Sequence, residues 1–179
     1  MSEVATRASV QDVWRWLAQV PDPEIPAISI VDLGIVREVR WDDSQFPATL
    51  MVTVTPTYSG CPATEVIAQS IRETLQQHGI EQPALQMRLS PAWTTDWLAP
   101  AAKEKLRAYG IAPPQGLASE QTIDISRLTR RPPATPVAVN CPCCGSRHTE
   151  VTSQFGATPC KALYVCRACA EPFDYFKCH

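Results

Sequence analysis

Apolar residues recur at helical spacing near the start of the chain. These positions, separated by three or four residues, are Val10, Val13, Trp14 and Leu17. The period is that of an amphipathic helix, and Ser9 stands where a helix-capping side chain is expected. We therefore predict a first helix that runs from Ser9 to about Val20, because Pro21 cannot continue it.

The patterns that follow predict three strands and two further helices. Residues 35–41 and 50–55 have the composition of neighbouring strands joined by a hairpin loop, and alternation at 85–89 predicts a third strand. Apolar residues at helical spacing predict helices at 63–78 and 100–109, each closed by a glycine. The predicted order is helix, strand, strand, helix, strand, helix.

A proline-rich segment divides the chain. Residues 113–136 hold five prolines and few large apolar side chains, which is typical of a tether. We predict a first domain over residues 1–112, a linker over 113–136 and a second domain over 137–179. The second domain has too few residues to fold on a hydrophobic core alone, so it needs another source of stability.

The composition indicates the cellular compartment of the protein and the kinds of partner that it can bind. No apolar run approaches the roughly 18 residues of a membrane span, and the start MSEVATRAS lacks a secretory pattern. We expect a cytoplasmic protein without membrane contact, whose eight cysteines serve as metal ligands or reactive thiols rather than disulfides. The formal net charge of -2, with four basic and three acidic residues over 141–179, argues against a nucleic-acid partner.

Four of the C-terminal cysteines have the spacing of a zinc ribbon. Two Cys-x2-Cys pairs flank a 21-residue segment, Cys141 with Cys144 and Cys166 with Cys169. Each pair lets a tight turn aim two sulfurs at one ion, and Gly145 supplies the backbone freedom that such a turn needs. We predict one tetrahedral zinc site, which can supply about 10 kcal/mol or more of folding free energy to a small unit.

Three more cysteines, Cys143, Cys160 and Cys178, lie in the same tail. A second metal ion or an iron-sulfur cluster held by these thiols is one interpretation. The other is that a lone cysteine commonly serves as a small buried hydrophobe. The sequence leaves both open, and it predicts exposed, unliganded side chains for His148 and His179.

Cys61 stands far from the other seven cysteines, between a predicted strand and a predicted helix. The backbone NH groups and the dipole at a helix start favour an anion, so its thiolate is expected to be accessible. A hydrolase would also need a base, yet His78 lies at the far end of the same helix, roughly 20 Å away. A buried thiol is the alternative. We favour a reactive or metal-handling thiolate, with Glu24 and Asp32 as nearby carboxylates.

Three short motifs resemble the MIP18 family of iron-sulfur assembly proteins, which have a DUF59-type domain. They are Asp22-Pro23-Glu24, Asp32-Leu33-Gly34-Ile35-Val36 and Thr57-Tyr58-Ser59-Gly60-Cys61-Pro62, and the resemblance covers about residues 10–110. It implies a small α/β (α+β) domain with a mixed sheet of three or more strands and flanking helices. The cluster-handling residues that it implies are Cys61, Asp22, Glu24, Asp32 and Thr57.

The tail is similar to that of proteins encoded with the phenylacetyl-CoA epoxidase genes. The motifs that carry this similarity are Phe155-Gly156, Cys160-Lys161-Ala162-Leu163-Tyr164 and Glu171-Pro172-Phe173-Asp174-Tyr175-Phe176-Lys177-Cys178. The resemblance implies a structural zinc ribbon and a non-enzymatic role in maturing this multicomponent monooxygenase for aerobic phenylacetate degradation. The implied function is iron-sulfur assembly or transfer, in which Cys61 binds iron or a cluster transiently and the [2Fe-2S] reductase component is the client.

Two other functions stay open at this point. A non-catalytic scaffold of the monooxygenase complex would differ only in having a dispensable Cys61. A catalytic subunit has less support, because none of the three histidines follows a glutamate by three residues, as the usual di-iron pattern requires. The sequence does not decide whether the oxygenase components also bind, or whether the chain forms a homodimer.

Overall fold

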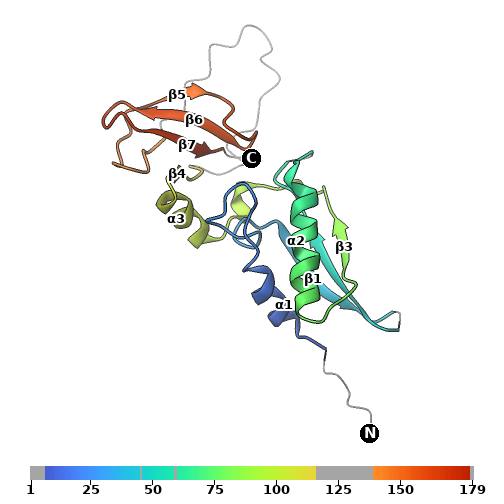
Figure 1. Ribbon diagram of the computed structural model, residues 1–179. Helices are drawn as coiled ribbons and strands as arrows, with labels where there is room; N and C mark the ends of the chain where they lie inside the picture. The colour runs from blue at the N-terminus through green and yellow to red at the C-terminus, as the bar shows by residue number, and fades with distance from the viewer. Residues whose placement is uncertain (1–6, 45, 59, 116–138, 178–179) are drawn as a thin grey trace, which may run out of the picture. The chain divides into compact units, whose positions relative to one another are not determined.

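The computed structural model describes residues 7–44, 46–58, 60–115 and 139–177 (Figure 1). The chain divides into two compact units, Met1–Trp93 and Thr94–His179. Each unit has its own sheet. None of the described helices is both long enough and apolar enough to cross a membrane.

The first unit combines two helices with a three-stranded sheet. Its elements are α1 (Val10–Leu17), β1 (Val36–Asp42), β2 (Thr49–Val54), α2 (Ala63–Gln77) and β3 (Ala84–Met87). The sheet order is β1-β2-β3, with β1 and β2 antiparallel and β2 and β3 parallel. The predicted element order and the mixed sheet are therefore confirmed, although α1 ends at Leu17 and not near Val20.

Local chemistry explains where these helices lie. The Ser9 hydroxyl accepts the NH of Asp12 at 3.1 Å, so Ser9 caps α1 as the sequence predicts. Gly79 has φ 83, a left-handed conformation that lets the chain turn after α2. Both helices bury apolar side chains at helical spacing, and these core residues are Val13, Leu17, Ile67, Ile71 and Leu75.

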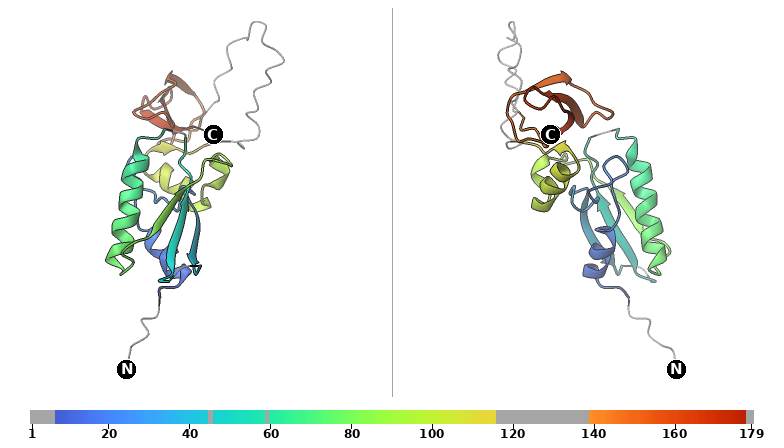
Figure 2. Two further views of the ribbon diagram at one scale, coloured as in Figure 1. Left: turned by 90° about the vertical axis from the view of Figure 1, so that its right-hand side faces the viewer. Right: turned by 60° about the vertical axis from the view of Figure 1, so that its left-hand side comes forward.

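Three loops of the first unit meet at one end of its sheet (Figures 1 and 2). Antiparallel pairing sets Val36 opposite Val54, so the chain before β1 and the chain after β2 share that end. Thr55 continues the pairing by donating its NH to the carbonyl of Ile35 at 2.8 Å. Parallel pairing brings the end of β3 to the same place, where Arg88 donates its NH to the carbonyl of Val54 at 2.9 Å.

The second unit is a four-stranded sheet with a short helical segment. Its elements are the 3-10 helix η1 (Thr95–Trp97), α3 (Pro100–Ala108), β4 (Ile111–Ala112), β5 (Thr149–Ser153), β6 (Lys161–Cys166) and β7 (Pro172–Phe176). The sheet order is β4-β7-β6-β5. Its buried core is made of Ala112, Val139, Cys141, Ala162, Tyr164, Cys166, Phe173 and Tyr175.

The division between the units falls after Trp93, earlier than the boundary at residue 112 that the sequence predicts. Strand β4 is the reason, because Ile111 and Ala112 pair in parallel with Asp174 and Tyr175 of β7. A two-residue strand carries no periodic signal, so its partner cannot be recognised from local pattern. Most of the predicted linker, residues 116–136, lies outside the described residues.

The side chain of Trp93 joins two of the converging loops and provides a test of this arrangement. Its Nε1 donates to the carbonyl of Leu33 at 2.8 Å, and the ring is buried. We expect Trp93→Phe to lower the free energy of unfolding by about 1 to 3 kcal/mol, because the buried Leu33 carbonyl loses this donor. Urea unfolding followed by far-ultraviolet circular dichroism measures the change.

The matched control is Trp16→Phe. Trp16 is half-buried and stacks on the ring of His78 at a centroid distance of 4.0 Å, without a comparable buried hydrogen bond among the described contacts. An equal loss of stability in the two variants would contradict the structural role of the Trp93 hydrogen bond.

Candidate functional site

The structure brings the four predicted metal ligands of the ribbon together. The sulfurs of Cys141, Cys144, Cys166 and Cys169 all lie within 4.8 Å of one another. The Cys141–Cys169 and Cys144–Cys166 sulfur pairs are 3.8 Å and 3.6 Å apart. A tetrahedral ion with metal–sulfur bonds of about 2.3 Å places its ligands about 3.8 Å apart. The donor set therefore fits a four-coordinate metal ion.

The two Cys-x2-Cys turns share a backbone feature, a residue with positive φ after the second cysteine. In the first turn, Gly145 has φ 74 and donates its NH to the carbonyl of Cys141 at 2.9 Å. In the second, Ala170 has φ 63, and Cys166 donates its NH to the carbonyl of Glu171 at 2.9 Å. A left-handed residue thus follows the second cysteine of each pair. The sequence indicates this for Gly145 but not for Ala170, because alanine rarely adopts that conformation.

The pKa values of two thiols in the cluster, Cys166 and Cys169, shift in opposite directions. The backbone NH of Cys169 stabilises the thiolate of Cys166 and, with other hydrogen bonds, lowers its pKa to about 6. The NH of Glu171 lowers the pKa of Cys169, but desolvation and the three neighbouring sulfurs outweigh it and raise that pKa to about 12. Four sulfurs this close cannot all carry charge without a compensating cation. A bound metal ion would supply that charge.

Cys143 and Cys160 do not belong to this cluster. Cys143 is exposed, while Cys160 is buried with its sulfur 3.0 Å from the hydroxyl of Thr158. Cys178 lies outside the described residues. Among the described residues, the four-cysteine cluster is the one group of three or more potential metal ligands. A second metal site that includes Cys143, Cys160 and Cys178 stays a prediction from the sequence.

Cys61 occupies a tight turn directly before α2, as predicted. Gly60 has φ 94, and Cys61 donates its NH to the carbonyl of Tyr58 at 3.3 Å. The Cys61 carbonyl accepts the NH of Thr64 at 3.2 Å, which closes the first turn. The Cys61 side chain is half-buried. The turn therefore holds the thiol at the start of a helix without removing it from solvent.

Two of the predicted acidic residues hold the backbone of their own loop. Asp22 is buried, and its Oδ1 accepts the NH groups of Glu24 and Ile25 at 3.0 and 2.8 Å. Asp32 Oδ2 accepts the NH of Ser29 at 3.0 Å, and Ser29 Oγ accepts the NH of Asp32 at the same distance. Both carboxylates thus shape the loop, a contribution that the sequence did not indicate.

Glu24 differs from these two carboxylates. Its side chain is half-buried, and its Oε2 atom is fully buried without a hydrogen-bond partner among the described residues. A buried carboxylate oxygen that lacks a partner is costly to a folded protein. Such an atom is a candidate ligand for a cation that binds at this end of the unit.

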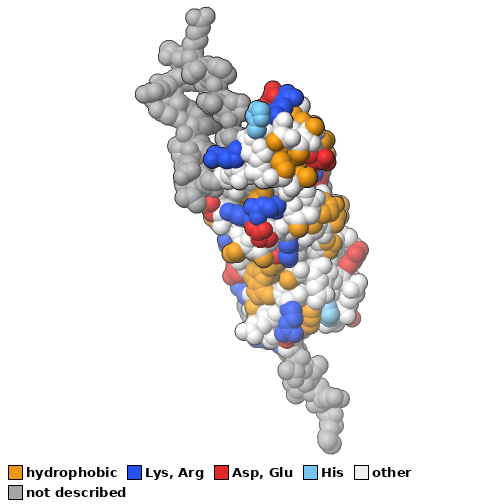
Figure 3. Space-filling view, turned by 90° about the vertical axis from the view of Figure 1, so that its left-hand side faces the viewer, with side chains coloured by type: hydrophobic (Ala, Val, Ile, Leu, Met, Phe, Trp, Pro, Cys, Tyr) orange, Lys and Arg blue, Asp and Glu red, His pale blue; other side chains and the backbone are white. Residues whose placement is uncertain are grey.

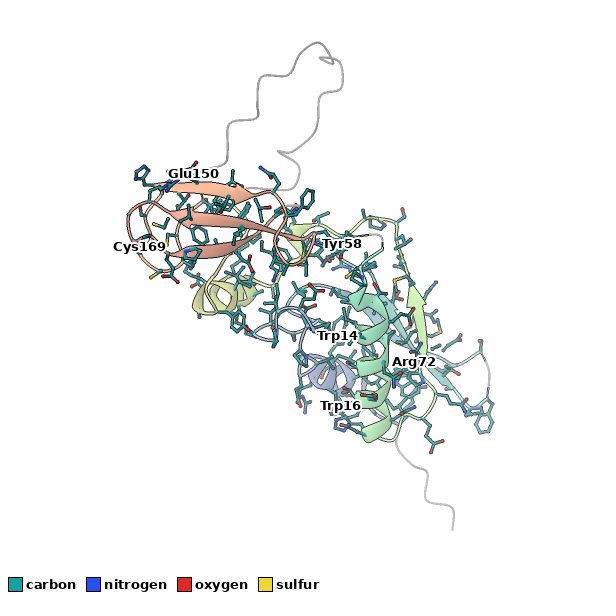
Figure 4. The ribbon with its side chains drawn as sticks, turned by 45° about the horizontal axis from the view of Figure 1, so that its top comes forward. Trp14, Trp16, Tyr58, Arg72, Glu150 and Cys169 are labelled. Carbon is teal, nitrogen blue, oxygen red and sulfur yellow. The ribbon has the colours of Figure 1, made fainter. Side chains whose placement is uncertain are left out.

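The first unit therefore gathers the predicted cluster-handling residues at one end of its sheet. The acidic loop precedes β1, and Thr57 and Cys61 follow β2, so the Ile35–Thr55 pairing draws the two loops together. Thr57 is half-buried. Tyr58, labelled in Figure 4, is a residue that sequence reasoning passed over, although its carbonyl fixes the Cys61 turn.

The fold and the four-cysteine cluster define a small α+β domain joined to a ribbon whose thiols fit a metal ion. Residues 10–80 match the family model "Iron-sulfur cluster assembly protein", and residues 127–177 match the "PaaD zinc beta ribbon domain". An Escherichia coli (strain K12) protein, whose name places it among the subunits of 1,2-phenylacetyl-CoA epoxidase, is 46% identical over 99% of both chains. The chain therefore belongs to the PaaD family, which confirms the resemblance.

Two shorter relatives match the first unit. A protein of Porphyromonas gingivalis named "Fe-S protein maturation auxiliary factor" is 30% identical over 54% of this chain and 89% of its own. The Fe-S protein maturation auxiliary factor YitW of Bacillus subtilis is 31% identical over 49% of this chain and 82% of its own. The first unit is thus similar to proteins whose names assign them to iron-sulfur protein maturation.

Replacing one ribbon ligand tests the metal site. We expect Cys144→Ser to lose the single bound metal ion and to unfold the ribbon, because three thiols bind the ion less tightly and the small sheet depends on it. Metal analysis measures the loss. Limited proteolysis should then digest the ribbon and leave a folded fragment that contains the first unit.

Cys143→Ser is the matched control, because Cys143 is exposed and lies one residue away from the same ligand but outside the cluster. It should keep the metal ion and the protease-resistant ribbon. Unfolding of the whole chain in Cys144→Ser, or a ribbon that stays resistant, would show that the metal site does not stabilise this unit separately.

Proposed function

We propose that this protein is an iron-sulfur assembly or transfer factor that matures the phenylacetyl-CoA epoxidase system. Its principal support is that Cys61 lies half-buried in a turn at the same end of the first unit as the unpartnered carboxylate oxygen of Glu24. The match of residues 10–80 to an iron-sulfur assembly family supports the same function.

The thiol of Cys61 and the nearby carboxylates are suitable ligands for an iron ion or cluster that is bound transiently. A thiolate is a ligand for iron and for iron-sulfur clusters, and a carboxylate oxygen is a ligand for iron ions. The first unit offers one thiol, Cys61, whereas a stable cluster in a protein is usually held by four. Weak capture of iron or a cluster through Cys61, with Glu24 at the same end of the sheet, allows release to a client. Asp22 and Asp32 contribute by shaping the acidic loop, and the half-buried Thr57 lies in the loop that carries Cys61.

The ribbon has a different metal role in this proposal. Its four thiols enclose one position completely, which is typical of a structural zinc site and leaves no place for a substrate. Zinc has no redox chemistry in proteins, so its contribution is the folding of the second unit. The ribbon then provides a rigid surface for binding a client.

The partner of this factor is a protein rather than a nucleic acid. On the face of the described residues drawn in Figure 3, Lys and Arg side chains are interspersed with Asp and Glu. A protein that follows a phosphate backbone instead gathers its basic residues along one surface. The accessory, non-enzymatic role agrees with the names of the two shorter relatives.

The [2Fe-2S] reductase component of the epoxidase is the client that fits this chemistry. A cysteine-ligated cluster must be delivered to thiolates, whereas a di-iron carboxylate site can load iron through its own oxygen and nitrogen ligands. The reductase therefore needs a transfer factor that carries a thiol, here Cys61, more than the oxygenase does.

Cys61→Ala tests the transfer role. We expect epoxidase maturation to fail, while metal content and thermal stability stay close to those of the wild type, because Cys61 is half-buried and backbone hydrogen bonds hold its turn. Growth on phenylacetate and epoxidase activity in extracts measure maturation. Cys143→Ala, at the exposed ribbon cysteine, is the control and should support normal growth. Full epoxidase activity with Cys61→Ala would favour the scaffold function.

Deletion of the protein identifies the client. Cells that lack it should make an oxygenase component with normal iron and a reductase component depleted of its [2Fe-2S] cluster. Visible spectra and iron and sulfide analysis of both purified components measure this. A fully clustered reductase beside an iron-free oxygenase would make the oxygenase the client, and two fully loaded components would refute a maturation role.

A further inference from the structure

A large exposed aromatic side chain lies at the end of the ribbon sheet opposite the metal ligands. Strand β6 runs from Lys161 to Cys166, so the metal cluster and the loop before Lys161 lie at opposite ends of this strand. Phe155 lies in that loop, between β5 and β6, and its side chain is 68% exposed. We call Phe155 and the neighbouring Lys177 the Phe155 tip.

A cation is held over the exposed ring. Lys177 Nζ lies 4.6 Å from the centroid of the Phe155 ring and donates to the carbonyl of Gln154 at 3.2 Å. Among the described residues, Lys177 forms no ion pair with a carboxylate. The Phe155 tip therefore presents an apolar surface with a positive charge beside it.

Hydrogen bonds fix the backbone of this loop. Ser153 Oγ donates to the carbonyl of Phe155 at 2.7 Å and accepts the NH of Phe155 at 3.3 Å. Gly156 donates its NH to the carbonyl of Lys161 at 2.9 Å, and Lys161 donates its NH to the carbonyl of Thr158 at 3.1 Å. The aromatic ring is thus carried on an ordered turn.

An ion pair between β6 and β7 lies against the same loop. Lys161 is buried, and its Nζ lies 3.3 Å from Asp174 Oδ2. Gly156 packs so closely above this pair that an added Cβ would lie 3.2 Å from Asp174 Oδ1 and 3.3 Å from Lys161 Cβ. Asp174 is thereby engaged by Lys161, which leaves the charge of Lys177 for another partner.

An exposed phenylalanine on a preorganised turn is typical of a binding anchor. Aromatic side chains at the centre of an interface contribute much of its affinity. A turn that is already ordered avoids the entropy cost of ordering it on binding. Ordering of the loop does not require the ring itself, because its hydrogen bonds use the backbone and the side chain of Ser153.

We propose that the Phe155 tip is the anchor with which the ribbon docks a partner protein, whose complementary surface is an apolar pocket bordered by carboxylates. Phe155 fills the pocket, and the Lys177 ammonium faces the carboxylates. This inference rests on the proposed function, under which the partner is a component of the epoxidase that receives its cluster.

Isothermal titration of the full-length, metal-loaded protein with the purified reductase and oxygenase components, each tested separately, measures docking. We expect Phe155→Ala to weaken binding to the client at least about tenfold, as for a central aromatic anchor. Lys177→Gln should cause a smaller loss and a weaker dependence of affinity on salt concentration. Metal content and thermal stability should not change in either variant.

Phe46→Ala is the matched control, since Phe46 is also an exposed phenylalanine but lies between β1 and β2 of the first unit. It should bind as the wild type does. Wild-type affinity of Phe155→Ala, equal losses in Phe155→Ala and Phe46→Ala, or no binding of the wild type to either component would overturn the inference. A change in the molar mass of the protein itself in Phe155→Ala, measured by light scattering, would make the tip a contact between two copies and would also overturn it.

Failure of docking and failure of the proposed function give different results. Normal binding by Phe155→Ala beside defective maturation by Cys61→Ala would overturn the docking inference and leave the transfer role standing. Lost binding by Phe155→Ala beside two fully loaded components, reductase and oxygenase, in deletion cells would support docking and refute the transfer role.

Discussion

The second unit depends on holding four thiol groups in one small space. Their sulfurs lie within 4.8 Å of one another, and two of the four cysteines, Cys141 and Cys166, also belong to the buried core of the sheet. Four thiolates repel one another unless a cation lies between them. A metal ion bound by all four sulfurs would join the two Cys-x2-Cys turns and with them the end of β6 and the chain before β5.

The paired strands β6 and β7 connect the metal cluster to the Phe155 tip. Antiparallel pairing of β6 with β7 runs from Val165 opposite Pro172, next to the cluster, to Lys161 opposite Phe176 at the other end. Strand β4 adds to the outer side of β7 and brings α3 into the unit. Rigidity that begins at the metal site thus extends to the surface that we propose for docking.

The ribbon cluster and Cys61 differ in the number of thiols that each offers to a metal ion. The ribbon surrounds one position with four sulfurs, which suits permanent binding and structural stability. Cys61 stands as one half-buried thiol in a turn that is fixed through its backbone, with the buried oxygen of Glu24 at the same end of the sheet. A site with so few donors would bind iron or a cluster weakly, as the proposed transfer role requires.

The sequence by itself determined the features that depend on neighbours along the chain. These are α1 to α3 and β1 to β3, whose periods are local, the ribbon ligands, whose spacing is local, and the position of Cys61 before α2. Tertiary structure decided the rest, because contacts between distant residues carry no periodic signal. Pairing of Ile111 with Asp174 moved β4 and α3 into the ribbon unit. Folding of the acidic loop gave Asp22 backbone partners and left a buried oxygen of Glu24 without one, a difference that two neighbouring carboxylates cannot reveal in sequence.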